Sequence, residues 1–166
     1  MNKAINTNNA PAAIGPYSQA IEANGMVFAS GQLPIDPATG NFAEGGIKEQ
    51  TRQSLTNAQN ILKEAGTDLA HVVKTTVFLS DMANFGEMNE VYSEFFTQPF
   101  PARSAVAVKT LPKNALVEVE CIAVKQRSAE IRIEMNGDYS KISAVVSIFS
   151  IKAIISLQKI IFLTIN

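Results

Sequence analysis

Apolar residues follow two different periods along this chain, and each change of period marks a predicted element. Residues 19–30 carry apolar stretches on either side of Asn24 and Gly25, a pair that suits a tight turn with positive φ. This pattern predicts a β-hairpin. From Ile47 the apolar positions recur at helical spacing as far as Gly66, a residue type that commonly ends helices. A helix is therefore expected after the hairpin.

A second series of elements follows. Residues 72–79 are rich in β-branched side chains and predict a strand, and residues 84–96 have the apolar spacing of a helix. Two further strands are expected over 102–108 and 116–125, joined by a turn at 112–114. The order ββαβαββ predicts an α+β fold, a mixed β-sheet with two helices packed on one face. The other face of such a sheet needs cover, which further copies of the chain can supply.

Composition narrows the function. A chain of 166 residues with 46% hydrophobic residues is long and apolar enough to fold around a core. The net charge of -1 gives no electrostatic reason to expect nucleic acid. Cys121 is the only cysteine, which excludes an internal disulfide, and the first residues lack the apolar run of a signal peptide. A cytoplasmic location is expected.

The inventory of chemical groups is also restrictive. His71 is the only histidine, so a catalytic histidine pair is excluded and a Ser/His/Asp triad is disfavoured. No Cys/His cluster has the spacing of metal ligands. Cys121 is expected to be a buried apolar residue and His71 a strand-edge residue. Any chemistry must use arginine, carboxylate, hydroxyl or backbone groups.

The last part of the chain differs in composition. Residues 127–166 are rich in isoleucine, serine and lysine, and Lys152 and Lys159 keep each apolar run below the roughly 18 residues of a membrane span. Serine and lysine recur at helix-like intervals, although so much isoleucine also favours strand. We expect a domain over residues 1–126 and an extension of unknown role over 127–166.

Charged candidates lie on the last two predicted strands. Arg103 can bind a substrate carboxylate through two parallel hydrogen bonds, or pair with a nearby acid on the surface. Glu118 and Glu120 share one face of a strand, about 6.8 Å apart, because side chains alternate. They can orient a water or transfer a proton, or they form a solvated face with cross-strand salt bridges. The residues alone leave both alternatives open.

Two weaker candidates lie nearer the N-terminus. Tyr17 follows a rigid Ile-Gly-Pro turn and can present its hydroxyl to a pocket or anchor the chain. Ser30 and Gly31 end the second predicted strand, where a glycine allows a ligand to approach the backbone or simply forms a turn.

Five segments together resemble the RidA family, formerly YjgF, in the order that the family has them. They are APAAIGPYSQ (residues 10–19), ASGQLP (29–34), VKTTVFL (73–79), FPARS (100–104) and VEVE (117–120). The resemblance implies a chorismate-mutase-like fold and a homotrimer whose sites lie in clefts between subunits. It also implies a 2-iminobutanoate/2-iminopropanoate deaminase, which hydrolyses reactive imines derived from 2-aminoacrylate to 2-ketoacids and ammonia. Such a reaction needs only an oriented water and a bound carboxylate, so no metal and no cofactor is expected.

The resemblance also implies roles for individual residues. Arg103 is expected to bind the substrate carboxylate, and Glu118 to position and activate the attacking water. Glu120 is then a helper or structural acid. Tyr17 is expected near the substrate, and the backbone of Gly31 against its carboxylate.

Further residues are implied at the pocket wall or its support, namely Ser30, Asn89 and Tyr92. Many members carry cysteine where this chain has Ala105, but the contact implied there is made by the main chain, so activity is expected to survive.

Two alternatives of other classes stay open. One is an endoribonuclease or translation inhibitor, an activity also ascribed to the family. The other is a non-catalytic trimer that binds a small ligand, because a fold alone does not determine function. Chorismate mutase shares the fold but needs several cationic groups around its substrate. The extension over 127–166 is a departure from the family, and it would block trimer assembly or substrate entry if it folded over the clefts between subunits.

Overall fold

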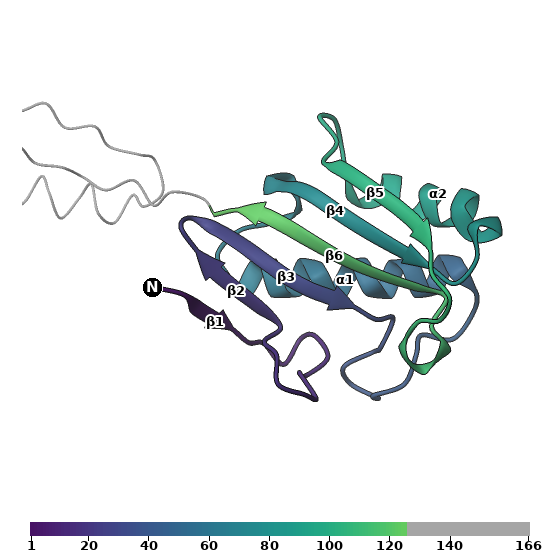
Figure 1. The fold of residues 1–166 in the computed structure, drawn as a ribbon, viewed down its shortest axis with the longest axis horizontal. Helices are drawn as coiled ribbons and strands as arrows, with labels where there is room; N and C mark the ends of the chain where they lie inside the picture. The colour runs from purple at the N-terminus through teal and green to yellow at the C-terminus, as the bar shows by residue number, and fades with distance from the viewer. Residues whose placement is uncertain (126–166) are drawn as a thin grey trace, which may run out of the picture. The chain divides into compact units, whose positions relative to one another are not determined.

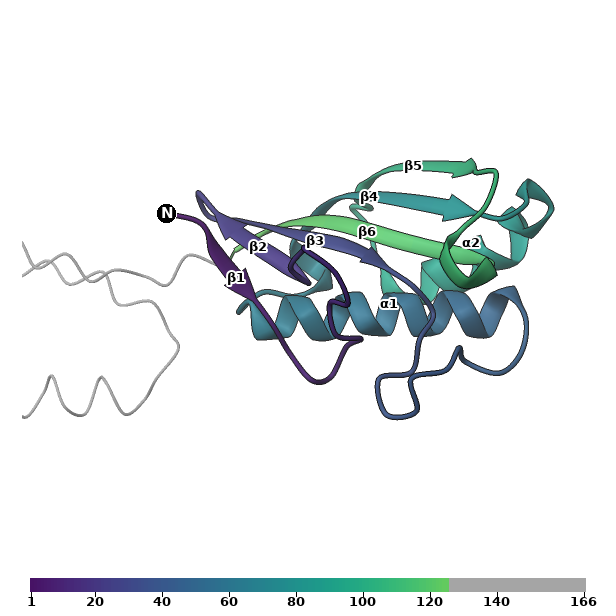
Figure 2. The ribbon, with the colours of Figure 1, turned by 60° about the horizontal axis from the view of Figure 1, so that its bottom comes forward.

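A computed structural model describes residues 1–125, in which a six-stranded sheet carries two helices on one side (Figures 1 and 2). The expected extension over 127–166 lies outside the described residues. The elements are β1 (Lys3–Ile5), β2 (Ala20–Ala23), β3 (Met26–Gln32), α1 (Ile47–Glu64), β4 (Val72–Leu79), α2 (Phe85–Phe95), β5 (Ala102–Ala107) and β6 (Val117–Val124). Single turns of 3₁₀ helix span Leu69–His71, Met82–Asn84 and Pro112–Asn114. Among the described residues, no helix is both long and apolar enough to cross a bilayer.

The sheet is mixed, as predicted. Its strand order is β1-β2-β3-β6-β4-β5, in which β4 and β5 are parallel and the other neighbours antiparallel. Asn24 and Gly25 have φ values of 51° and 74° in the turn between β2 and β3. These positive values match the tight hairpin turn that an Asn-Gly pair favours.

The predicted element order lacked one strand. β1 covers only Lys3–Ile5 and pairs with β2 at the edge of the sheet. A strand of three residues is too short to show an alternating pattern, so the sequence carries no signal for it. The prediction that the second strand ends at Gly31 was wrong by one residue. Strand β3 continues to Gln32, across an irregularity in its pairing with β6.

The core lies between the sheet and the helices. Alternate residues of β6, namely Val117, Val119, Cys121 and Ala123, are buried on the side of the helices. Helix α1 buries one stripe of apolar positions against β3 and β6, and it also contacts α2. The predicted burial of Cys121 is therefore confirmed, and burial raises the pKa of its thiol to about 12.

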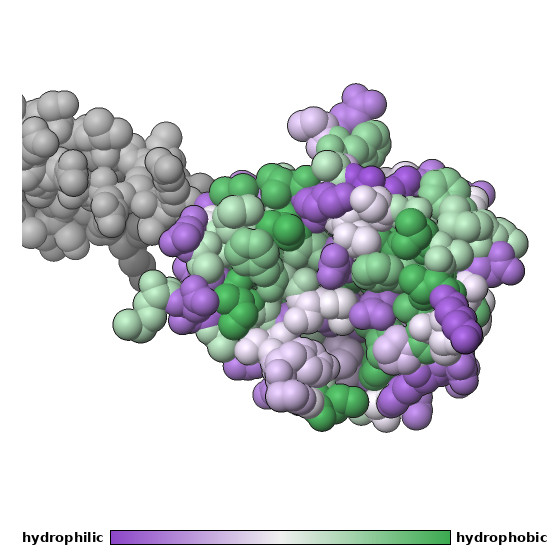
Figure 3. All heavy atoms as spheres, viewed as in Figure 1, coloured by the Kyte–Doolittle hydropathy of each residue, from purple (hydrophilic) through white to green (hydrophobic). Residues whose placement is uncertain are grey.

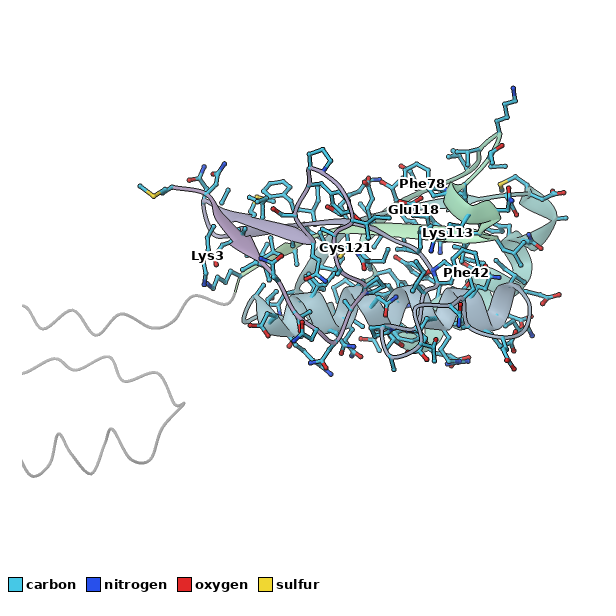
Figure 4. All side chains as sticks on the ribbon, turned by 90° about the horizontal axis from the view of Figure 1, so that it is seen from below. Lys3, Phe42, Phe78, Lys113, Glu118 and Cys121 are labelled. Atoms are coloured by element: carbon cyan, nitrogen blue, oxygen red, sulfur yellow. The ribbon has the colours of Figure 1, made fainter. Side chains whose placement is uncertain are left out.

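The opposite face of the sheet is open and mixes hydrophobic with hydrophilic residues (Figure 3). Phe28 and Val124 on this face are each 42% exposed, and Val106 of β5 is 46% exposed. Glu118 and Phe78 are paired across β6 and β4 and point away from α1 (Figure 4). Helices thus cover one face of the sheet, whereas the apolar side chains of the open face contact water in a single chain.

Candidate active site

Glu118 lies in the middle of the sheet against the backbone of Gly31 on the neighbouring strand. A Cβ atom added to Gly31 would lie 1.9 Å from Oε1 of Glu118 and 2.8 Å from its Cδ. Such distances are far below a van der Waals contact, so a side chain at position 31 would displace this carboxylate. The backbone of Gly31 was expected to contact the substrate carboxylate. In the structure, the carboxylate of Glu118 lies against Gly31 on the open face.

The environment of Glu118 favours its protonated form. Partial burial raises the pKa of its carboxyl group above the ordinary value, and the negative charge of Glu120 adds to the rise. Glu120 lies two residues further along β6 and is exposed on the same face, as the alternation of the strand predicts. The pair thus combines one half-buried carboxyl with one exposed carboxylate.

Arg103 lies on β5 beside helix α2. Its guanidinium carbon lies 4.5 Å from the centre of the Tyr92 ring and 5.6 Å from the centre of the Phe85 ring. Among residues 1–125, no carboxylate forms an ion pair with it. The alternative of a surface arginine paired with an acid is therefore wrong for the described part of the chain.

Two other expected residues lie near Arg103 in the fold. Ala105 follows it by two residues on β5, so it shares the same side of the strand, where it packs against the core. Asn89 is exposed on α2, four residues after Phe85 and three before Tyr92. On a helix this spacing puts Asn89 next to both rings.

Tyr17 belongs to the segment that precedes β2 and is 52% exposed. The hydroxyl of Ser30 donates a 2.7 Å hydrogen bond to the carbonyl of Ser18, and the backbone N–H of Ser30 donates to the carbonyl of Gln19 at 3.0 Å. Ser30 therefore holds the segment that carries Tyr17, and its hydroxyl is engaged by the protein itself.

The two principal residues are not brought together within one chain. In the strand register, Thr75 of β4 pairs with Arg103 of β5 on one side and with Cys121 of β6 on the other. Glu118 of β6 pairs with Phe78 of β4, three residues further along. Two strand spacings and three residues of offset separate Arg103 from Glu118 by about 14 Å at their Cα atoms. Their side chains also point to opposite faces, since Arg103 contacts α2 and Glu118 lies on the open face.

Among residues 1–125, no group of three or more His, Cys, Asp or Glu side chains could hold a metal ion. His71 ends a 3₁₀ turn rather than standing alone at a strand edge, and its Nδ1 lies 2.6 Å from Oδ1 of Asp68.

The sequence analysis missed two residues that surround or support Arg103. Phe85 was not singled out, although the positions 85, 89 and 92 have helical spacing and include two aromatic residues. Thr75 was also missed. Its hydroxyl bonds to that of Tyr92 at 2.8 Å on the buried side of β4, where Val77 and Leu79 are also buried. A hydroxyl on an otherwise apolar strand face is the signal that points to it.

The chain resembles known proteins over the described region. A family model described as Endoribonuclease L-PSP matches residues 7–125. A RutC family protein of Pyrococcus horikoshii is 54% identical over 126 residues, which are 76% of this chain and 100% of that protein. The 2-iminobutanoate/2-iminopropanoate deaminase of Bos taurus is 50% identical over 123 residues, covering 74% and 90%.

Solved structures share the fold. A putative endoribonuclease of Thermotoga maritima superposes with a TM-score of 0.74 at 50% identity, covering 76% of this chain and 99% of its own. TdcF of E. coli, solved with bound serine, gives a TM-score of 0.71 at 43% identity, covering 75% and 99%. The relatives thus include proteins named as deaminases and proteins named as endoribonucleases.

Proposed function

Since the chain belongs to the RidA/YjgF family, we propose that it is a 2-iminobutanoate/2-iminopropanoate deaminase that needs no cofactor. The observation that carries the proposal is Arg103, a cation beside two rings with no acid partner among the described residues. Such a cation suits the carboxylate of a small acid. The similar protein TdcF was solved with bound serine, a small amino acid that carries such a carboxylate.

The reaction makes modest demands on the protein. Arg103 holds the carboxylate of the 2-iminoacid, and Glu118 accepts a proton from a water molecule whose oxygen attacks the imine carbon. Glu118 returns the proton to the nitrogen, which gives a carbinolamine. It then takes the proton of the new hydroxyl group and passes it to the amine as the C–N bond breaks, so that a 2-ketoacid and ammonia leave. A raised pKa suits this role, because a base works best when its pKa lies near the working pH.

The remaining residues complete the proposed pocket. Tyr17 contributes its exposed hydroxyl, and Ser30 supports the segment that carries it. Gly31 and Glu120 line the Glu118 side. Asn89 and the main chain of Ala105 belong to the Arg103 side.

We further propose that the site forms between copies of the chain in a homotrimer. Arg103 and Glu118 are too far apart, and on opposite faces, to hold one small molecule within a chain. The apolar side chains of the open face support assembly, since a second copy can remove them from water. Arg103 of one copy then completes the pocket around Glu118 of another.

The test is the release of ammonia and 2-ketoacid from freshly generated 2-iminobutanoate or 2-iminopropanoate, against the uncatalysed rate. Wild type is expected to accelerate the reaction. Arg103→Ala is expected to lower kcat/KM about 100-fold, the loss of two charge-assisted hydrogen bonds. Arg52→Ala is the matched control, because Arg52 forms an exposed pair with Glu94 on the helices. No acceleration by wild type would refute the deaminase.

The domain boundary is tested in the same assay. The family model ends at residue 125, which supports a deaminase domain over residues 1–126 and a separate extension over 127–166. A chain that stops after Gln126 is expected to accelerate the reaction as the full chain does.

An endoribonuclease is the second candidate, because the family model and one similar structure carry that description. The net charge of -1 does not favour binding to phosphates. Cleavage of RNA that Glu118→Gln abolishes, with salt-dependent binding and no imine hydrolysis, would favour this candidate over the deaminase.

A further inference from the structure

Helix α2, rather than an acid, fixes the guanidinium of Arg103. The guanidinium carbon lies 4.5 Å from the Tyr92 ring centre and 5.6 Å from that of Phe85. Both distances are within the roughly 6 Å at which a cation is attracted to an aromatic face. A ring attracts the cation without presenting an acceptor oxygen, so the N–H donors of Arg103 stay available to a ligand.

Tyr92 is itself held in place. Its hydroxyl and Oγ1 of Thr75 are 2.8 Å apart in a buried hydrogen bond, and Thr75 is fully buried on β4. The ring of Phe96 packs against that of Tyr92 with 4.4 Å between centres. The ring of Tyr92 cannot turn away without leaving a buried hydroxyl unpaired, which is unfavourable.

We propose that Tyr92, anchored by Thr75, is a positioning residue that sets the orientation of the Arg103 guanidinium for binding a carboxylate. The proposal rests on the proposed function in one respect, that the ligand is the carboxylate of an iminoacid. Register supports the anchor, because Thr75 and Arg103 are paired across the parallel strands β4 and β5. Arg103 and Thr75 are thus neighbours across two strands. Arg103 is the cation that the Tyr92 ring contacts, and Thr75 anchors that ring.

Substitutions separate the ring from its anchor. Tyr92→Leu removes the ring, and KM for 2-iminobutanoate is expected to rise about tenfold. The value of kcat is expected to stay within about twofold, because the arginine binds the carboxylate equally in the ground and transition states. Tyr92→Phe and Thr75→Val keep a side chain of similar shape and lose one hydroxyl each, and each is expected to raise KM about threefold. The double variant is expected to match the single ones, since all three lack the same hydrogen bond.

A control on the same helix isolates the role of Tyr92. Phe95 is a partly buried aromatic residue of α2 that packs against the core, without a ring contact to Arg103. Phe95→Leu is expected to lower the Tm as Tyr92→Leu does and to leave KM unchanged. An equal rise of KM in Phe95→Leu would overturn the proposal, because the effect would then be general loss of packing.

A measurement independent of activity separates this proposal from the proposed function. Because the guanidinium carbon lies 4.5 Å from the Tyr92 ring centre, the ring current is expected to shift the Nε–Hε signal of Arg103 in an NMR spectrum of the full chain, and Tyr92→Leu is expected to move that signal. Titration with 2-oxobutanoate, a stable carboxylate, gives the affinity of the same site. Wild type without deaminase activity but with a moved signal would refute only the proposed function. An unmoved signal in Tyr92→Leu, or an unchanged KM in folded Tyr92→Phe and Thr75→Val, would refute the positioning role.

Discussion

Glycine at position 31 has a steric role at the proposed site. The carboxylate of Glu118 fills the space that a side chain at that position would need. The φ of Gly31 is not positive, so the close approach of Glu118, and not the backbone conformation, is what a side chain at this position would disturb. Activity should therefore respond to a single methyl group at this position.

Gly31→Ala tests this directly. The added methyl must displace the Glu118 carboxylate, and a shift of about 1 Å in a catalytic group lowers activity about 100-fold. The free energy of unfolding is expected to fall by less than about 1 kcal/mol, because the added methyl meets the end of a flexible, half-buried side chain that can move. Gly86→Ala on α2 is the control, because a Cβ there meets no atom within 4 Å, and it is expected to stabilise the helix by about 0.5–1 kcal/mol. Assays of kcat/KM and thermal unfolding read out both variants. Full activity in Gly31→Ala would show that the position of the carboxylate does not matter.

The raised pKa of Glu118 predicts a pH profile. The carboxylate form is the base, so kcat/KM is expected to rise with pH through the raised pKa, above the ordinary range of a glutamate. Glu120→Gln removes a neighbouring negative charge that contributes to the rise, so the acid limb should move to lower pH. Rates measured from about pH 4.5 to 8 decide the matter, with buffers of constant ionic strength. A limb that does not move would exclude Glu118 as the titrating group.

The same shift predicts a stability effect of the opposite sense. The folded state binds the Glu118 proton more tightly than the unfolded state, because its pKa is raised. The free energy of unfolding therefore falls as the pH rises from the ordinary carboxyl pKa through the raised one. Glu118→Gln, which stays neutral, is expected to raise the Tm at pH 7 relative to wild type and to lose that advantage near pH 4. Activity is lost in this variant at both pH values.

At the scale of elements, one side chain ties the N-terminal segment to the sheet. The Gln19 Oε1 accepts a hydrogen bond from the backbone N–H of Thr7 at 2.7 Å. Its Nε2 donates to the carbonyls of Thr7, Ala10 and Pro11 at 3.0, 3.3 and 2.7 Å. Gln19 is almost fully buried, so these bonds replace water for a segment without regular structure. The position of Tyr17, two residues away, depends on this anchor.

Gln19→Leu is expected to free this segment. The change leaves several buried polar groups without a partner and is expected to cost about 2 kcal/mol of stability. The amide of Thr7 should lose its protection against hydrogen exchange, and kcat/KM should fall because Tyr17 is no longer held. Gln59→Leu on α1 is the control, since the Gln59 side chain has no hydrogen bond within residues 1–125. Unchanged protection at Thr7 would contradict the anchor.

At the scale of the whole molecule, the proposed site is divided. One half lies between β5 and α2 and holds Arg103, and the other lies on the open face and holds Glu118. Neither half can both bind the carboxylate and activate water. The proposed homotrimer removes this difficulty, because each site takes one half from each of two copies.

Mixing two inactive variants tests the division. Arg103→Ala retains the Glu118 half, and Glu118→Gln retains the Arg103 half. Equal amounts unfolded and refolded together are expected to recover about a quarter of wild-type activity, the share of random sites that join two intact halves. The double variant refolded with itself is the control and stays inactive. No recovery in mixed oligomers, with assembly checked by light scattering, would refute a site built from two copies.

Much of the fold could be predicted from the sequence. The hairpin around Asn24 and Gly25, the helix that starts at Ile47 and the strand over Val72–Leu79 all agree with the structure. Each rests on a local signal, a turn pair or a period of apolar positions. β1 could not be predicted, because Lys3–Ile5 is too short to carry a period and pairs only as an edge.

The candidate site was predicted less completely. Alternation on one strand correctly put Glu118 and Glu120 on the same face and Cys121 on the other. The contacts of Arg103 with Phe85 and Tyr92 could not be predicted, because they depend on how helix α2 packs against strand β5.

By itself, the sequence determined the α+β order of elements, the family and the residue types that can carry chemistry, because these follow from local periods and motifs. Only the tertiary structure decided that Arg103 and Glu118 lie on opposite faces of the sheet. The parallel pairing of β4 with β5 sets Arg103 level with the buried Thr75, toward α2, whereas the antiparallel pairing of β4 with β6 sets Glu118 beside Phe78 on the open face. Alternation within a strand indicates which residues share a face. It does not indicate which residue of β5 or β6 pairs with which residue of β4, because helices and loops separate these strands in the chain.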